Sequence, residues 1–115
     1  MVFAMATFRK ETFYTMRRLD DGSVGSVRVN GWTDGEYNYY SVKNPYSNLS
    51  TWFAIDKDSG LNVFSGTSRN EVRQKVLNNL DKINEYKKTE RYNEQVMQFY
   101  NAKVKTGAIV FLNNN

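Results

Sequence analysis

Apolar and polar side chains alternate through much of the first half of the chain, which is the pattern of strands with one covered face. Clusters of Asp, Gly and Ser separate these stretches at residues 20–23, 34–35 and 56–60, and such clusters are typical of tight turns. The pattern predicts strands over residues 13–19, 24–32, 37–43, 52–55 and 61–64. Because the turns are short, the first three strands are predicted to form an antiparallel meander.

A different spacing begins after Gly66, where apolar residues recur every three or four positions, as in a helix packed on a sheet. Ser68 followed by Glu71 is a capping-box pattern and predicts the helix start. The apolar positions of this helix are Val72, Val76, Leu77, Leu80 and Ile83. A second set, out of phase with the first, comprises Tyr92, Val96, Phe99 and Tyr100. The change of phase predicts a break near residues 87–89, a second helix capped by Thr89, and an end at residues 106–107.

These elements predict a single α+β domain over residues 1–115, with a four- or five-stranded, mainly antiparallel sheet followed by two helices packed on one face. Residues 1–11 are expected to form a partly mobile start, residues 12–66 the sheet and residues 68–106 the helices. Residues 107–115, which include an apolar stretch, are expected to add a short strand or form a tail. The loop at residues 44–49 holds the only proline and is the predicted place for an insertion or a contact.

Positive charge is concentrated in the second half of the chain. Residues 1–66 contain seven basic and seven acidic residues. Residues 67–115 contain nine basic and five acidic residues, which accounts for the net charge of +4. The candidate binding residues in the helical region are Lys82, Lys87, Lys88 and Arg91. A basic edge of this kind attracts phosphate or an acidic protein surface. The same residues fit the solvated face of a helix, which is the interpretation we favour.

Catalysis is not predicted, because the sequence contains no histidine and no cysteine. The usual general base near neutral pH and the most reactive nucleophile are therefore missing, and the acidic residues form no recognisable pair. The sequence predicts no cofactor and no metal site, and its apolar runs are far shorter than the roughly 20 residues that span a bilayer. A cytosolic binding protein that does not enter membranes is the simplest interpretation.

Aromatic residues make up 15% of the chain, and several lie on predicted strands. The rings that would offer stacking surfaces belong to Tyr37, Tyr39, Tyr40 and Trp52, and the cations on neighbouring strands belong to Arg17, Arg18, Arg28 and Lys43. Such a sheet would bind single-stranded nucleic acid. We favour packing of these rings in the core, because strand aromatics usually face a second layer and the strand half carries no net charge.

The block WFAIDKDSGLNVFSGTSRNEVRQKVLNNL at residues 52–80 combines an aromatic-led strand, a Ser-Gly turn, an apolar strand and a capped amphipathic helix. It resembles a pattern in small accessory proteins encoded by bacterial phages and prophages, some of which are anti-CRISPR proteins. Such proteins bind a Cas effector and block guide loading, target-DNA binding or cleavage. The resemblance implies an inhibitory protein of the host bacterial cytosol, with a Cas effector and its guide RNA as partner, and it implies no particular binding residues.

We therefore expect a phage-derived inhibitor that blocks a type II Cas nuclease by steric occlusion of a nucleic-acid site. Two opposed surfaces remain open for this contact, because acidic turns would mimic phosphates whereas the basic helical edge would touch bound guide RNA. The acidic candidates are Asp20, Asp21, Asp34 and Glu36.

Two other functions remain open. The first is a small DNA- or RNA-binding regulator, whose affinity would fall steeply with added salt because phosphate contacts release counterions. The second is an assembly protein that forms homodimers through Tyr92, Phe99 and Tyr100, although these residues are also expected to complete the core.

Overall fold

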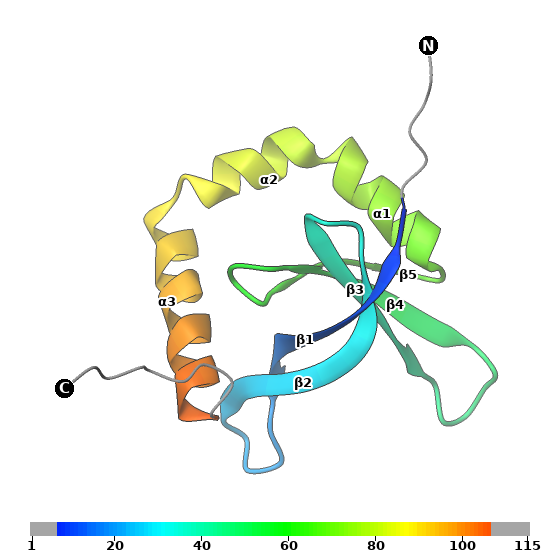
Figure 1. Ribbon diagram of the computed structural model, residues 1–115, viewed down its shortest axis with the longest axis horizontal. Helices are drawn as coiled ribbons and strands as arrows, with labels where there is room; N and C mark the ends of the chain where they lie inside the picture. The colour runs from blue at the N-terminus through cyan, green and yellow to red at the C-terminus, as the bar shows by residue number, and fades with distance from the viewer. Residues whose placement is uncertain (1–6, 107–115) are drawn as a thin grey trace.

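Five strands follow one another as a meander in the computed structural model, which describes residues 7–106 (Figure 1). They are β1 (Arg9–Arg18), β2 (Val24–Thr33), β3 (Tyr37–Lys43), β4 (Ser50–Asp56) and β5 (Asn62–Gly66). Neighbouring strands are antiparallel and pair in chain order, which confirms the α+β class and the antiparallel sheet. β1 begins inside the stretch expected to be a mobile start. The parts of that start before residue 7, and the strand or tail expected at residues 107–115, lie outside the described residues.

The sheet is strongly curled between its second and third strands. β2 pairs with β1 at ten residue pairs but with β3 at only two. Gly31 lies where the strands diverge, and a Cβ at this position would collide with the carbonyl oxygen of Tyr39, so the close approach requires glycine. The curl brings β1 to the β4–β5 turn, where the Met16 amide and the Thr15 hydroxyl donate hydrogen bonds to the Gly60 carbonyl (3.1 and 3.0 Å).

Three helices follow the sheet where two were expected: α1 (Arg69–Asn78), α2 (Leu80–Lys87) and α3 (Glu90–Lys105). The predicted break at residues 87–89 is confirmed, and the Thr89 hydroxyl caps α3 by accepting a hydrogen bond from the Tyr92 amide. The additional break falls at Asn79. Its side-chain amide donates a hydrogen bond to the Lys75 carbonyl (2.8 Å), which a backbone amide would bond to if the helix continued, and α1 ends there. Figure 1 shows the helices following one another in an arc around the sheet.

The start of α1 carries the predicted cap in a modified form. The Ser68 hydroxyl accepts a hydrogen bond from the Glu71 amide (3.1 Å), as expected of a capping box. The Glu71 carboxylate, however, accepts from the amide and hydroxyl of Thr67 rather than from the cap residue (2.7 and 2.6 Å). The carboxylate therefore fixes the end of β5 to the first turn of α1.

The largest core cluster lies between the sheet and the first two helices. Its buried members are Tyr37, Tyr39, Ala54, Val72, Val76 and Ile83. Leu77 and Leu80, which the helical period placed on the same stripe, are partly exposed because the chain turns at Asn79 between them. In α3, Tyr92 and Phe99 are buried, as expected of residues that complete the core, whereas Tyr100 is partly exposed.

Candidate functional site

The outer half of the β3–β4 hairpin extends beyond the strands on either side of it. β3 and β4 pair along their full length. On one side β2 pairs with β3 no further than Tyr39, and on the other side β5 pairs with β4 no further than Trp52. Residues 41–51, which we call the arm, therefore project as a two-stranded ribbon. In Figure 1 the loop of the arm lies at the lower right, away from α2 and α3.

The arm ends in a hydrogen-bonded turn. The Ser47 amide donates to the Asn44 carbonyl (3.3 Å), with Pro45 at the second position of the turn, and the Asn44 amide donates to the Leu49 carbonyl (2.9 Å). The Asn44 side-chain oxygen accepts from the Tyr46 amide (2.9 Å), and the Ser47 hydroxyl accepts from the Leu49 amide (3.2 Å). Proline suits this position because its φ is already fixed near the turn value. The tip therefore has a defined backbone.

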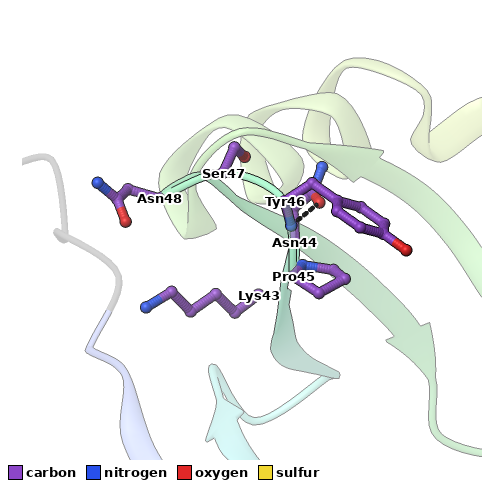
Figure 2. Close-up of a pocket in the computed structure, with 6 residues that line it drawn as sticks. All are labelled: Lys43, Asn44, Pro45, Tyr46, Ser47 and Asn48. Atoms are coloured by element: carbon purple, nitrogen blue, oxygen red, sulfur yellow. Dashed lines mark hydrogen bonds between the residues drawn. The ribbon is translucent and has the colours of Figure 1, made fainter.

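Large apolar side chains are exposed on this defined backbone. Tyr46 is 96% exposed, Leu49 74% and Val42 43%. Figure 2 shows the Tyr46 ring on one side of the loop and the side chains of Lys43 and Asn48 on the other. Large apolar side chains that are exposed on a projecting loop suit contacts to another protein, and a preformed loop loses little conformational entropy on binding.

A groove of about 350 Å³ lies beside the base of the arm. It is lined by Arg17, Tyr40, Val42, Lys43, Asn44, Pro45, Thr51 and Phe53. Nη2 of Arg17 donates to the Tyr40 hydroxyl (3.4 Å), and its guanidinium carbon lies 5.9 Å from the centre of the Tyr40 ring. The rings of Phe13 and Phe53 also contact Tyr40, with centroid distances of 6.0 and 5.3 Å. These contacts hold Tyr40 in place and position Arg17 at the groove.

Most of the rings proposed as stacking surfaces are part of the core. Tyr39 is completely buried and its hydroxyl donates to Asp34 (2.7 Å), so it offers no ring face to a ligand. Tyr37 is buried, and Trp52 is half-buried against the same cluster. The core packing favoured from the sequence is therefore confirmed for these three residues, and of the four proposed rings Tyr40 is the one that borders the groove.

The three strand arginines proposed as binding cations do not converge. Arg17 lies at the groove, whereas Nη1 of Arg18 donates to the Gly22 carbonyl in the β1–β2 turn (3.1 Å). Arg28 is exposed on β2, in register with Tyr14 of β1. The structure thus brings one of these cations, Arg17, together with a predicted aromatic residue.

The proposed basic edge of the helices is divided between the interior and the surface. Nζ of Lys87 lies 3.3 Å from the Asp56 carboxylate and 5.4 Å from the centre of the Tyr37 ring. Nζ of Lys88 pairs with Glu85 at 3.3 Å on the surface. Lys82 and Arg91 are exposed. Lys87 is therefore committed to a contact within the protein, which leaves three of the four for a partner.

Lys87 belongs to a polar cluster around buried Asp56. One Asp56 oxygen accepts hydrogen bonds from the hydroxyls of Ser59 and Tyr92, both at 2.7 Å, and the other faces Lys87. Burial alone would raise the pKa of Asp56, but the hydrogen bonds from Ser59 and Tyr92 and the charge of Lys87 outweigh it and hold the pKa below its ordinary value. Burial and the bond to Asp56 raise the pKa of Tyr92. Because these groups satisfy one another, the cluster fixes α2 and α3 to β4.

Asp34, one of the proposed phosphate mimics, is also engaged inside the protein. It accepts hydrogen bonds from the Tyr37 amide (2.8 Å) and the Tyr39 hydroxyl (2.7 Å), and Nε of Arg73 lies 3.4 Å away. Burial would raise the pKa of Asp34, but these hydrogen bonds and the arginine hold it below its ordinary value. The other acidic candidates are exposed, and they are Asp20, Asp21 and Glu36.

The arm was only partly visible in the sequence. The polar loop containing Pro45 predicted a contact surface, and the structure adds that the strands leading to it lack neighbours. The groove residue Arg17 comes from a distant strand, so its meeting with Tyr40 and Phe53 has no local signal in the sequence.

In the part of the chain that the structure describes, no helix is long and apolar enough to cross a membrane. The same residues contain no group of three or more Asp, Glu, His or Cys placed to hold a metal ion. Comparison of the chain with models of protein families, with curated proteins and with solved structures finds no match.

Proposed function

We propose that this protein is an inhibitory binding protein that attaches to another protein through the arm. The observation that carries the proposal is the exposure of Tyr46 and Leu49 on a hydrogen-bonded turn at the end of a projecting ribbon. Tyrosine supplies a large contact area at a low entropic cost and is enriched among residues that dominate binding energy. Burial of both side chains in a partner would give the arm its affinity.

Steric occlusion is the proposed mode of inhibition. A narrow ribbon fits a groove of its partner, and the sheet and helices behind it then cover the surface beside that groove. The resemblance of residues 52–80 to phage accessory proteins favours a type II Cas nuclease as the target, in the cytosol of a bacterial host. Occlusion requires neither a catalytic residue nor a cofactor in this protein.

A pull-down with matched variants tests the arm. The tagged protein is added to a bacterial lysate that contains a type II Cas nuclease with its guide RNA, with and without nuclease treatment, and bound proteins are identified by mass spectrometry. The double variant Tyr46→Ser/Leu49→Ser removes the apolar tip. Met97→Ser is the control, because Met97 is 58% exposed on α3 and lies outside the arm.

The proposal predicts that the wild type and Met97→Ser retain the Cas nuclease after nuclease treatment and that the double variant loses it. Capture of the Cas nuclease by the double variant at the wild-type level would exclude the arm as the binding surface. Recovery that disappears after nuclease treatment would contradict direct protein binding and favour contact through nucleic acid.

A small DNA- or RNA-binding regulator is the second candidate. It is supported by Arg17 and Lys43 beside the groove and by exposed Lys82, Lys88 and Arg91 on the helices. Fluorescence polarisation with labelled single-stranded DNA, duplex DNA and RNA tests it at low and at physiological salt. A steep loss of affinity with salt supports this candidate, since phosphate contacts release counterions, and weak binding that is insensitive to salt argues against it.

A further inference from the structure

β3 has an open edge along its outer half. Its pairing with β2 ends at Tyr39, whereas its pairing with β4 continues to Lys43. Within residues 7–106, no strand pairs with the side of Ser41–Lys43 that faces away from β4. An edge of this kind presents unpaired backbone groups and is a template for an added strand.

The hydrogen-bond alternation of antiparallel strands identifies which backbone groups face this edge. The Asn44 amide bonds to the Leu49 carbonyl across the arm, so in the same register Val42 and Tyr40 direct their backbone groups toward β4. Ser41 and Lys43 then direct their amides and carbonyls toward the open side. The edge therefore offers two residues, each with a donor and an acceptor, to an extended chain.

The groove at the base of the arm, which is lined by residues of both β3 and β4, is positively charged. Arg17 and Lys43 are the charged residues that line it, and no carboxylate is among its lining residues. Within the described residues, no ion pair engages Arg17, whose guanidinium is held by Tyr40. Val42 and Phe53 provide the apolar lining of the same groove. This combination suits a segment that carries an apolar residue and a carboxylate.

We infer that the open edge of β3 binds an extended, acidic segment of the partner protein by strand addition. The segment pairs with the backbone of Ser41 and Lys43, and one of its Asp or Glu side chains pairs with Arg17. The inference rests on the proposed function, because it names the chemistry of the partner segment that lies beside the arm.

The same observations disfavour a nucleic acid at this edge. A phosphodiester backbone has no N–H donors to pair with strand carbonyls, so it leaves half of the open backbone groups unused. Stacking needs a free ring face, and Tyr40 is already in contact with Phe13, Phe53 and Arg17. A peptide uses both the edge and the charge.

Selection from a phage-displayed library of short linear peptides tests the inference, with the wild type and four variants immobilised. Ser41→Pro removes the outward amide and leaves the β4 ladder intact, while Ser41→Ala keeps the amide and is its control. Arg17→Glu places a carboxylate beside Lys43 and removes the net positive charge of the groove. Tyr46→Ser alters the tip of the arm and leaves the edge unchanged. Thermal melts establish that each variant is folded, and a labelled single-stranded DNA is measured in parallel.

The wild type, Ser41→Ala and Tyr46→Ser are expected to enrich peptides with Asp or Glu between β-branched residues. Ser41→Pro is expected to bind the enriched peptides about tenfold more weakly, as the loss of one hydrogen bond implies, and Arg17→Glu is expected to lose the enrichment of acidic peptides. No enrichment, neutral or basic peptides on the wild type, or unchanged binding to folded Ser41→Pro would overturn the inference. DNA binding that Ser41→Pro retains and Arg17→Glu loses would also overturn it. Because changes at the tip leave this edge intact, failure of the proposed function, tested by Tyr46→Ser/Leu49→Ser in the pull-down, is distinguishable from failure of the edge, tested by Ser41→Pro and Arg17→Glu in the selection.

Discussion

Removing a single hydroxyl from the Asp56 cluster gives a sharp test of how the helices are held on the sheet. Tyr92 is buried in α3 and donates to Asp56 of β4 at 2.7 Å, across 36 positions of sequence. The substitution Tyr92→Phe deletes this bond and keeps the ring, including its edge-on contact with Tyr86 at 5.7 Å.

The expected cost follows from the charge of the acceptor. A hydrogen bond to a charged group contributes about 1.5–3 kcal/mol to stability. Asp56 keeps two hydrogen bonds from Ser59 and its ion pair with Lys87 in the variant, so the carboxylate is not left unpaired. We therefore expect Tyr92→Phe to lower the free energy of unfolding by about 2 kcal/mol, or roughly 10 °C in Tm for a domain of this size.

The cost is also expected to depend on pH. The pKa of Asp56 is lowered in the folded state, so its ionisation stabilises the protein above the ordinary value of 3.8, and this contribution is lost as the pH falls through the folded pKa. Tyr92→Phe removes one bond that keeps the pKa low. The difference in free energy of unfolding between the wild type and Tyr92→Phe is therefore expected to be largest near pH 7 and to shrink well below pH 3.8.

Urea unfolding followed by tyrosine and tryptophan fluorescence measures both effects, with m-values compared to establish two-state behaviour. Tyr86→Phe is the matched control, because Tyr86 is 39% exposed and touches the same ring. It is expected to change stability by less than about 0.5 kcal/mol. A Tyr92→Phe cost as small as that of the control, or a cost independent of pH, would refute this account of the cluster.

Three further predictions concern other parts of the fold. Gly60→Ala is expected to cost about 2–4 kcal/mol in urea unfolding, because Gly60 has a φ of +68° and its Cβ would lie 2.6 Å from the Phe99 ring; a neutral result would contradict the contact. Thr89→Ala removes the cap of α3 and is expected to lower the free energy of unfolding by about 1 kcal/mol, whereas Thr89→Ser keeps the capping hydroxyl and is expected to retain most of the stability; equal losses in the two variants would exclude capping as the cause. Tyr46→Ser is expected to leave Tm within about 3 °C of the wild type because the side chain is 96% exposed, and a larger drop would mean that Tyr46 supports the fold.

The local features of this fold were readable from the sequence, because each depends on neighbouring residues. Alternation and turn residues located the five strands, and hydroxyl residues before apolar periods located the caps at Ser68 and Thr89. The break at Asn79 was missed, since the apolar period continues across it.

Features that depend on distant residues were not readable. The sequence placed Lys87 on an exposed edge, but Asp56 of β4 holds it in a polar cluster. It left Tyr39 open as a ligand contact, but Tyr39 is completely buried in the core between the sheet and the first two helices. The arm is a candidate site because β2 and β5 stop pairing early, and strand composition does not specify where pairing ends.

Inhibition of a purified type II Cas nuclease loaded with guide RNA is the measurement that tests the central claim most directly. Cleavage of target DNA is followed while the wild type, Met97→Ser or Tyr46→Ser/Leu49→Ser is titrated in. The account predicts that the wild type and Met97→Ser stop cleavage near equimolar concentration and that the arm variant requires at least about tenfold more protein. Unchanged cleavage with a large excess of the wild type, or equal inhibition by the arm variant, would contradict it.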